Sequence, residues 1–253
     1  MSSSTWFGRH GGKDQLRQRI WSMLTAHQAV CRNPVGHIPN FIGAEAAAER
    51  LAGTECWHKA QVVKCNPDSP HRPVRLRALA DGKVLYMAVP ELAHQRCFVE
   101  LTAATLGQQE VPLAEAASMA GAMRYGRPVT FAEMSIVDLV VVGCVAVTPR
   151  GGRTGKGAGF ADLELAMLRE CGLISEVTPI VTTVHDLQVV PASELPMQRH
   201  DWPLDMVVTP TRCLVTEPSY AKPVGLDWAT LQPDQLANIP ILQQWNQRRQ
   251  LPF

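Results

Sequence analysis

A glycine-rich segment between an apolar stretch and a helix-like stretch constrains this chain more than any other feature. Residues 151–159 read Gly-Gly-Arg-Thr-Gly-Lys-Gly-Ala-Gly; they follow the apolar residues 136–147 and precede the helical pattern of residues 160–171. Glycines let a backbone approach an anion closely, and the N-terminus of the following helix presents free N–H groups and a positive dipole end. Arg153 and Lys156 add two positive charges. The segment therefore predicts a phosphate-binding loop; the alternative is a flexible surface turn.

The loop departs from both common nucleotide-binding patterns. A Walker loop needs glycine five residues before the Gly-Lys pair and Ser or Thr after it, and Arg150 and Gly157 stand at these positions. A dinucleotide-binding pattern that starts at Gly155 would need glycine where Phe160 stands. The sequence therefore indicates phosphate chemistry outside these two families.

The composition is that of a globular chain without a strong charge bias. The 253 residues, 46% of them hydrophobic, suffice for one large or two small domains. The net charge of +1 argues against a general nucleic-acid binder. No apolar run approaches the ~20 residues that cross a bilayer, and Met1–Thr5 lacks the apolar core of a secretion signal. The seven cysteines show no zinc-site spacing, so we expect buried, reduced thiols in a cytoplasmic protein.

Apolar periodicity predicts strands that alternate with helices along the chain. Helical patterns cover residues 13–26, 44–51, 74–80, 112–122, 160–171 and a short stretch near 239–247. Strand patterns cover residues 61–64, 83–89, 136–147, 179–184 and 206–209. Such alternation is typical of an α/β fold with a largely parallel sheet and helices on both faces. Ligands bind such sheets beyond the carboxyl ends of the strands, where the glycine loop is expected to lie.

Three segments carry a resemblance to a known family. Lys13-Asp14-Gln15-Leu16-Arg17 is similar to the motif K-x-x-L-R, residues 153–162 to R-L-G-[RK]-G-K-G-Y-Y-D, and residues 200–209 to h-D-x-x-v-D-x-i-i-T. In this order the segments resemble the 5-formyltetrahydrofolate cyclo-ligases, also called methenyltetrahydrofolate synthetases, over most of residues 10–212. Residues 38–44 look like a divergent branch of that family, the synthetase-domain-containing proteins.

The resemblance implies a fold and an activity. The fold is the α/β fold shared by sugar-phosphate isomerases and CoA transferases, formed by residues 1–212, with residues 213–253 as a C-terminal extension packed on the surface. The activity is an ATP- and Mg²⁺-dependent ligation that converts 5-formyltetrahydrofolate to 5,10-methenyltetrahydrofolate by phosphoryl activation of the formyl oxygen. The implied partner is a small molecule, a reduced folate.

The resemblance also implies the residues of the site. The nucleotide is expected to contact Lys13, Arg17, Arg153, Gly155, Lys156, Gly157, Gly159 and Phe160. Arg153 and Lys156 would neutralise the phosphates as negative charge develops during transfer. Asp162 and Asp201 would bind Mg²⁺, which typically takes one or two carboxylates, with Asp205 as the runner-up for Asp201.

Each of these residues also has a plainer interpretation. Lys13 and Arg17 lie one helical turn apart and could form a solvated helix face. Asp162 could stabilise a helix N-terminus, and Phe160 could belong to the core. The adjacent His185 and Asp186 are expected to be structural, because neighbours on a strand point to opposite faces.

Several positions depart from the family pattern. Ala158 and Ala161 stand where the family has lysine and its second tyrosine, Phe160 replaces the first tyrosine, and Thr154 replaces leucine. The acidic residue that holds folate in the family has no clear match, and Asp68 is nearest. Two alternatives therefore stay open: a non-catalytic protein that binds nucleotide or folate, and an ATP-dependent enzyme that acts on another heterocycle.

Overall fold

An eight-stranded sheet forms the centre of the protein. The computed structural model describes residues 10–217 and 219–250; the expectation for residues 1–5 lies outside this part. The strands follow the order β10-β9-β8-β5-β1-β2-β3-β4. They are β1 (Val62–Cys65), β2 (Val84–Ala88), β3 (Phe98–Leu101), β4 (Arg127–Val129), β5 (Leu139–Val141), β8 (Ile180–Thr183), β9 (Met206–Val208) and β10 (Cys213–Val215). The five central strands are parallel, whereas β3, β4 and β10 pair antiparallel, so the expected largely parallel sheet is confirmed.

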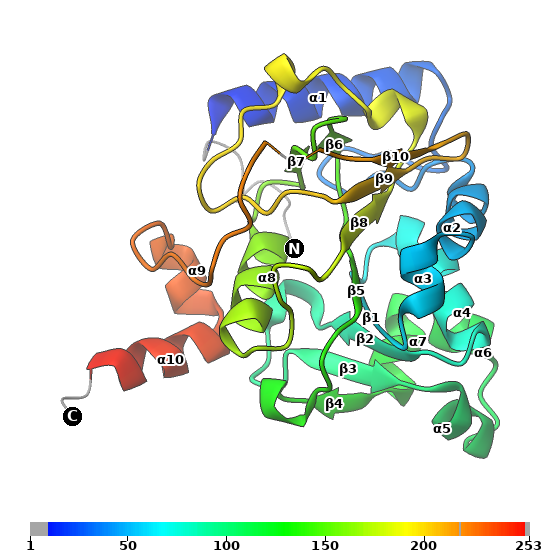
Figure 1. Ribbon diagram of the computed structural model, residues 1–253, viewed down its shortest axis with the longest axis vertical. Coiled ribbons are helices and arrows are strands. Elements are labelled where there is room, and N and C mark those ends of the chain that lie inside the picture. The colour runs from blue at the N-terminus through cyan, green and yellow to red at the C-terminus, as the bar shows by residue number, and fades with distance from the viewer. Residues whose placement is uncertain (1–9, 218, 251–253) are drawn as a thin grey trace.

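Helices cover both faces of this sheet (Figure 1). They are α1 (Gly11–Ala26), α2 (Ala44–Ala52), α3 (Glu55–Lys59), α4 (Arg72–Ala80), α5 (Ala103–Gln108), α6 (Leu113–Ala116), α7 (Met119–Tyr125), α8 (Phe160–Glu170), α9 (Pro233–Asn238) and α10 (Pro240–Gln250). In Figure 1, α2, α4 and α7 lie on one side of the sheet and α8 on the other. No helix in the described part is long and apolar enough to cross a membrane.

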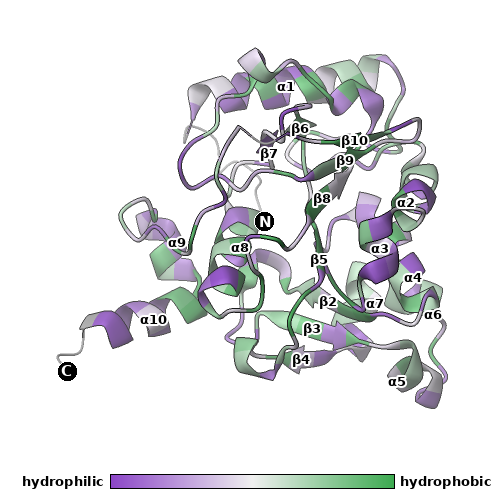
Figure 2. Ribbon diagram, in the orientation of Figure 1, coloured by the Kyte–Doolittle hydropathy of each residue, from purple (hydrophilic) through white to green (hydrophobic). Residues whose placement is uncertain are grey.

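The strands are buried on both faces, as their continuous apolar sequences require. On β5, Val140 packs in the core beneath α8, whereas Leu139 and Val141 pack in the core beneath α2 and α4. This alternation follows from the two-residue period of a strand. Figure 2 shows hydrophobic residues along these central strands and hydrophilic residues on the outward parts of the helices.

Most of the elements expected from periodicity are present at their expected places. The helices at 13–26, 44–51, 74–80 and 160–171 and the strands at 61–64, 83–89, 179–184 and 206–209 are confirmed to within a few residues. The expected helix at 112–122 is instead two short helices, α6 and α7. The side chain of Ser118 accepts a hydrogen bond from the amide of Gly121 and so begins a new helix.

The expected strand at 136–147 is also interrupted. It ends with β5 at Val141, and the chain bends before β6 (Ala146–Val147), which pairs antiparallel with β7 (Arg153–Thr154). At the bend, a Cβ on Gly143 would lie 2.7 Å from Oδ2 of Asp68, so a larger residue there would displace that carboxylate. The first glycines of the predicted phosphate loop therefore form a buried hairpin turn, and only its second half is free to form a binding loop.

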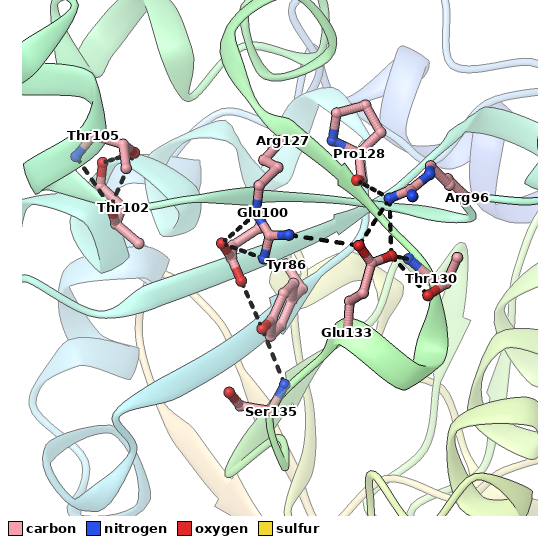
Figure 3. Close-up of polar contacts among 10 residues, drawn as sticks. All are labelled: Tyr86, Arg96, Glu100, Thr102, Thr105, Arg127, Pro128, Thr130, Glu133 and Ser135. Atoms are coloured by element: carbon pink, nitrogen blue, oxygen red, sulfur yellow. Dashed lines mark hydrogen bonds and ion pairs between the residues drawn. The ribbon is translucent and has the colours of Figure 1, made fainter.

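A polar network closes the antiparallel edge of the sheet (Figure 3). The hydroxyl of the buried Tyr86 donates a 2.9 Å hydrogen bond to Glu100, which pairs with Arg127 across β3 and β4. Arg127 also lies 3.8 Å from Glu133, which pairs with Arg96. The network links four segments near this edge, and we assign it a structural role.

The cysteines are only partly as expected. Cys65, Cys97 and Cys144 are buried, and burial raises the pKa of the Cys65 thiol to about 11. Cys31 and Cys171 are exposed, as is Cys213 on the edge strand β10. The expectation of buried thiols is therefore wrong for these three, and the charged neighbours Arg32, Glu170 and Arg212 were the sequence signal of their exposure.

The buried His71 should make the stability depend on pH. It lies in η2 (Ser69–His71), and burial, together with Arg75 and Lys64, lowers its pKa from 6.5 to about 3. The unfolded chain takes up a proton below about pH 6.5 that the folded protein does not, so stability falls as the pH drops from 6.5 towards 3. Between pH 7 and pH 5 we expect a loss of roughly 2 kcal/mol in the free energy of unfolding.

Urea unfolding at these two pH values checks this expectation. The variant His71→Leu removes the titrating group, so its free energy of unfolding should fall distinctly less than that of the wild type between pH 7 and pH 5. Equal losses in the two proteins would contradict the assignment to His71.

Candidate functional site

A cavity of about 700 Å³ lies where β1 and β5 end and α8 begins. Its volume is within the range of small-molecule sites. It is lined by α1, the loop at 32–40, the loop at 66–69, residues 153–164, the segment at 198–201 and residues 225–235. The cavity thus lies at the carboxyl ends of parallel strands, where the sequence predicts the ligand.

The glycine loop forms one wall of this cavity. Residues 153–159 line it, whereas Gly151 and Gly152 are buried in the hairpin turn. Gly157 and Gly159 have φ angles of +117° and +78°, a region that residues with a Cβ rarely adopt. Gly159 is the N-cap of α8, and the first turn of that helix also lines the cavity. A loop of this shape at a helix N-terminus suits an anion.

Both cations of α1 line this cavity, and Arg17 contacts the glycine loop directly. Lys13 and Arg17 are each only 5% exposed. Nε of Arg17 donates a 2.7 Å hydrogen bond to the carbonyl of Gly155, and another guanidinium nitrogen pairs with Asp14. Lys13 pairs with Asp201. The alternative of a solvated helix face is therefore wrong for this pair.

The hydrophobic face of α1 explains this placement. Leu16, Ile20 and Trp21 pack against Val145 and Ala146 of the hairpin region. This packing fixes α1 across the β6–β7 hairpin, which ends at the glycine loop (Figure 1). The helix therefore brings Arg17 to Gly155, although the two residues are 138 positions apart in the sequence.

Arg153 lies in the site, where it holds other site residues in place. Its guanidinium pairs with Asp162, and its Nε donates to the carbonyl of Trp202 at 2.8 Å. Burial lowers the pKa of Arg153, but Asp162, Cys144 and Asp201 outweigh that effect and raise it overall. The amide of Trp202 also donates to Asp162 at 3.0 Å. Arg153 therefore connects the start of α8 with the segment that carries Asp201.

Asp162 and Asp201 both line the cavity with their carboxylates partly engaged. Oδ1 of Asp162 accepts from Arg153 and Trp202, and Oδ2 of Asp201 accepts from Lys13 and from the amide of Gln198. The other oxygen of each carboxylate accepts no hydrogen bond from a described residue, so it is available to a cation. Among residues 10–217 and 219–250 no group of three or more potential metal ligands occurs. Among the described residues the protein therefore offers a cation at this place two carboxylates at most, a number that Mg²⁺ accepts when phosphate oxygens and water supply its other ligands.

Asp205, the runner-up for the metal site, has a structural role. Its carboxylate accepts a 2.7 Å hydrogen bond from the amide of Ile180 and pairs with Lys222 at 2.7 Å. These contacts join β8, β9 and the C-terminal extension outside the cavity lining. His185 and Asp186 do not lie on a strand, as the sequence reasoning assumed: β8 ends at Thr183, and Nδ1 of His185 accepts a hydrogen bond from the amide of Leu187 at the start of a 3-10 helix.

Lys156 and Asp68 both line the cavity. Lys156 is half-buried and forms no salt bridge with a described residue. Burial raises the pKa of Asp68, and Lys156, Arg75 and Lys64 oppose this shift. The carboxylate of Asp68 packs against Gly143, at the end of β5. Asp68, which sequence comparison could not align firmly, therefore belongs to the site.

A buried ion pair that sequence analysis missed forms the floor of the cavity. Lys64 of β1 is fully buried and pairs with Glu164 of α8, which lines the cavity. Nζ of Lys64 also donates to Oδ1 of Asn66 at 2.6 Å. The sequence offered one signal: a lysine inside an otherwise apolar strand needs a buried partner.

Phe160 lies where both of its interpretations remain possible, and only its packing against the core is confirmed. It lines the cavity and packs against the core beneath α8. Ala158 and Ala161 also line the cavity, and Ala158 is only 2% exposed. At this point the cavity combines an apolar surface with the neighbouring polar loop, as a ring-containing ligand requires.

Comparison with known proteins agrees with this geometry. The family model described as the 5-formyltetrahydrofolate cyclo-ligase family matches residues 9–210. The chain belongs to the 5-formyltetrahydrofolate cyclo-ligase family. The resemblance inferred from the three sequence segments is thereby confirmed, and so is the α/β fold that it implied.

Relatives from the divergent branch match more of this chain than the family model does. The chain is 38% identical over 238 residues to the methenyltetrahydrofolate synthase domain-containing protein of Mus musculus, which covers 93% of this chain and 63% of that protein. The protein of the same name from Homo sapiens is 37% identical over 240 residues, or 94% of this chain and 62% of that protein. This member of the cyclo-ligase family thus spans about three-fifths of the length of these relatives.

A solved structure supports the fold. The NMR structure of 5,10-methenyltetrahydrofolate synthetase from Aquifex aeolicus aligns with a TM-score of 0.50 at 18% sequence identity. The alignment covers 87% of this chain and 99% of that protein. At this low identity the likeness establishes the shared fold of the cyclo-ligase family and nothing about the substrate.

Proposed function

We propose that this protein is an ATP- and Mg²⁺-dependent ligase that converts 5-formyltetrahydrofolate to 5,10-methenyltetrahydrofolate. The observation that carries the proposal is the convergence of Lys13 and Arg17 on the glycine loop, inside a cavity that also holds two aspartates. Membership of the cyclo-ligase family supports the choice of substrate. Such a protein would act in the cytoplasm on a small molecule.

The cations around the loop would bind the triphosphate. Lys13, Arg17 and Lys156 supply positive charge, and residues 155–159 line the same space. Asp162 and Asp201 would hold Mg²⁺, which neutralises charge on the transferring phosphoryl group. Arg153 would act mainly by fixing Asp162, because its guanidinium is already paired with that carboxylate.

Phe160 and Asp68 would face the folate. Phe160 supplies an apolar surface for a ring, and Asp68 supplies a carboxyl whose pKa is raised by burial. Because Asp68 lines the same cavity as the glycine loop, it would bring the folate next to the phosphates.

The reaction needs positioning and charge stabilisation more than a protein nucleophile. The formyl oxygen bonds to the γ-phosphorus as the bond to ADP breaks. N10 then attacks the activated carbon and loses its proton, the carbon–oxygen bond breaks, and inorganic phosphate leaves. Fixed positive charge from α1 and the loop would stabilise the negative charge that develops in the first step.

A second candidate function is binding of nucleotide or folate without turnover. It is favoured by Ala158, which removes a positive charge of the family pattern, and by Arg153, whose charge is engaged by Asp162. The retained Lys13, Arg17, Asp162 and Asp201 oppose it, because a protein that only binds its ligand needs no groups that stabilise charge during phosphoryl transfer.

ADP release with and without 5-formyltetrahydrofolate separates these functions. Folate-dependent release of ADP, matched by formation of the methenyl product, supports the cyclo-ligase. Binding of ATP without any turnover supports the binding protein. Turnover only with another heterocycle would show that the substrate has changed.

Restoring the family lysine at Ala158 tests how the loop has adapted. From sequence alone such a lysine should raise turnover, but Ala158 is only 2% exposed and its carbonyl accepts a hydrogen bond from Gln235. A lysine at this position would overpack the site, so we expect Ala158→Lys to lower the melting temperature by roughly 2–10 °C without a gain in turnover. Thermal denaturation and ADP release measure both effects; higher turnover at an unchanged melting temperature would contradict the expectation.

A further inference from the structure

The C-terminal extension reaches into the candidate nucleotide site through one side chain. Gln235 of α9 is only 7% exposed, and its Nε2 donates a 3.0 Å hydrogen bond to the carbonyl of Ala158. Ala158 lies in the middle of the glycine loop, 77 residues earlier in the chain. A residue outside the part that matches the family model therefore contacts the loop directly.

The amide group of Gln235 is held at both ends. Its Oε1 accepts a 2.9 Å hydrogen bond from the amide of Gln232, as part of the capping box that begins α9. If the amide were flipped, two donors would face each other at Gln232 and two acceptors at Ala158. The two contacts therefore fix the N–H of Gln235 towards the loop.

The same side chain also limits the shape of the loop. A Cβ on Gly159 would lie 3.1 Å from Nε2 of Gln235, and Gly159 has a φ angle of +78°. Gly159 is the N-cap of α8, so its conformation sets how the loop enters the helix. Gln235 thus bonds to the residue before Gly159 and leaves little room for a side chain at that helix N-cap.

The extension that carries Gln235 is anchored in the main core. Ile239 is 1% exposed and Leu242 is fully buried, in the core that also contains Leu165 of α8. Trp245 packs on Phe131 with ring centroids 5.6 Å apart. Figure 1 shows α9 beside α8, with α10 continuing past it. A side chain on such an anchored segment can restrain a glycine loop.

The extension also supplies part of the cavity wall. Leu226, Asp227, Thr230, Leu231 and Gln232 line the cavity together with Gln235. The amide of Leu226 donates to Glu170 at 3.1 Å, which ties this wall to the end of α8. The extension is therefore part of the site and not only a cover for the surface.

We propose that Gln235 is a positioning residue of the nucleotide loop: its amide holds residues 155–159 in the conformation that receives the phosphates. The expected consequence, tighter binding of ATP by the positioned loop, rests on the proposed function. The fixed amide restrains a loop that carries Ala158 in place of the family lysine. Gln235 does not itself need to touch the nucleotide.

The variant Gln235→Glu tests this role in the full chain. Glutamate has nearly the same shape and keeps the acceptor for the amide of Gln232, but it cannot donate to the carbonyl of Ala158. Gln235→Met removes the same donor without adding a charge. The matched control is Gln243→Glu, because Gln243 is exposed and its Nε2 donates to the carbonyl of Ala237 at 2.6 Å, away from the loop.

Hydrogen exchange of residues 155–163, measured by mass spectrometry without nucleotide, is the first readout. We expect both Gln235 variants to raise the exchange rate of this segment about fivefold, whereas Gln243→Glu leaves it unchanged. Unchanged exchange in the Gln235 variants would overturn the proposal. An equal increase throughout the sheet would also overturn it, because that pattern indicates general destabilisation.

Binding of Mg-ATP by calorimetry is the second readout. Both Gln235 variants should bind about tenfold more weakly than the wild type, with Gln243→Glu unaffected. If the wild type binds ATP and the Gln235 variants bind it equally well, the positioning role is wrong while the proposed function stands. If the wild type binds no ATP, the proposed function fails, and the exchange measurement still decides whether Gln235 positions the loop.

Discussion

Replacing Arg17 by methionine should lower kcat/KM for ATP on the order of 10²–10³-fold. Methionine keeps much of the buried aliphatic length but removes the guanidinium that contacts the carbonyl of Gly155. The variant therefore loses a fixed positive charge at the phosphates and an anchor of the loop. Steady-state ADP release at varied ATP concentration measures the effect.

Arg19→Met is the matched control for this prediction. Arg19 lies on the same helix, but its side chain is 54% exposed and pairs with Glu194 at the surface. We expect its kinetics to remain within about twofold of the wild type, because exposed ion pairs contribute little. Equal kinetics for Arg17→Met and Arg19→Met, with both proteins folded, would remove Arg17 from the nucleotide site.

Replacing Asp162 by asparagine should have a comparable effect through the metal. An amide is a poor substitute for a carboxylate that binds Mg²⁺, so kcat/KM for Mg-ATP should fall on the order of 10²-fold and the Mg²⁺ requirement should rise. The buried Arg153 also loses its anionic partner, which should cost about 3 kcal/mol of stability. Activity at varied Mg²⁺, measured well below the melting temperature, separates the two effects.

Asp205→Asn provides the control for the loss of stability. Asp205 also holds a backbone amide and a lysine, but it lies outside the cavity lining. The variant should be destabilised while keeping the wild-type Mg²⁺ dependence. A metal dependence of Asp162→Asn that equals that of the wild type would count against Asp162 as a metal ligand.

The central part of the site could be predicted because its residues stand close together in short sequence segments. The glycines with positive φ angles, Gly157 and Gly159, stand in one local motif, and Lys13 and Arg17 share one helix face. The family resemblance then joined two segments that are far apart in sequence, and the hydrogen bond from Arg17 to Gly155 confirms their proximity.

Other features could not be predicted because they depend on long-range packing. The apolar run at 136–147 concealed the break after β5, since the residues before and after the bend are equally buried. In the same way, the helical pattern at 112–122 gave no sign that one helix ends before Ser118 and another begins after it. In both cases the pattern of apolar residues indicates which residues are buried, but not where the backbone bends.

Asp68 and Gln235 illustrate a second limit. Asp68 follows β1 at the carboxyl edge of the sheet, so topology could have placed it near the glycine loop once the order of the strands was known. Gln235 gave no such signal, because its neighbours Pro233 and Asp234 are typical of any short surface helix. Only the packing of Ile239 and Leu242 in the main core brings it to the loop.

A crystal structure with ATP and Mg²⁺ tests the central claim most directly. We expect the triphosphate to lie against the amides of residues 155–159, within hydrogen-bonding distance of Lys13 and Arg17, with the metal between Asp162 and Asp201. A nucleotide bound elsewhere on the molecule, or phosphates that leave both cations of α1 uncontacted, would contradict this account.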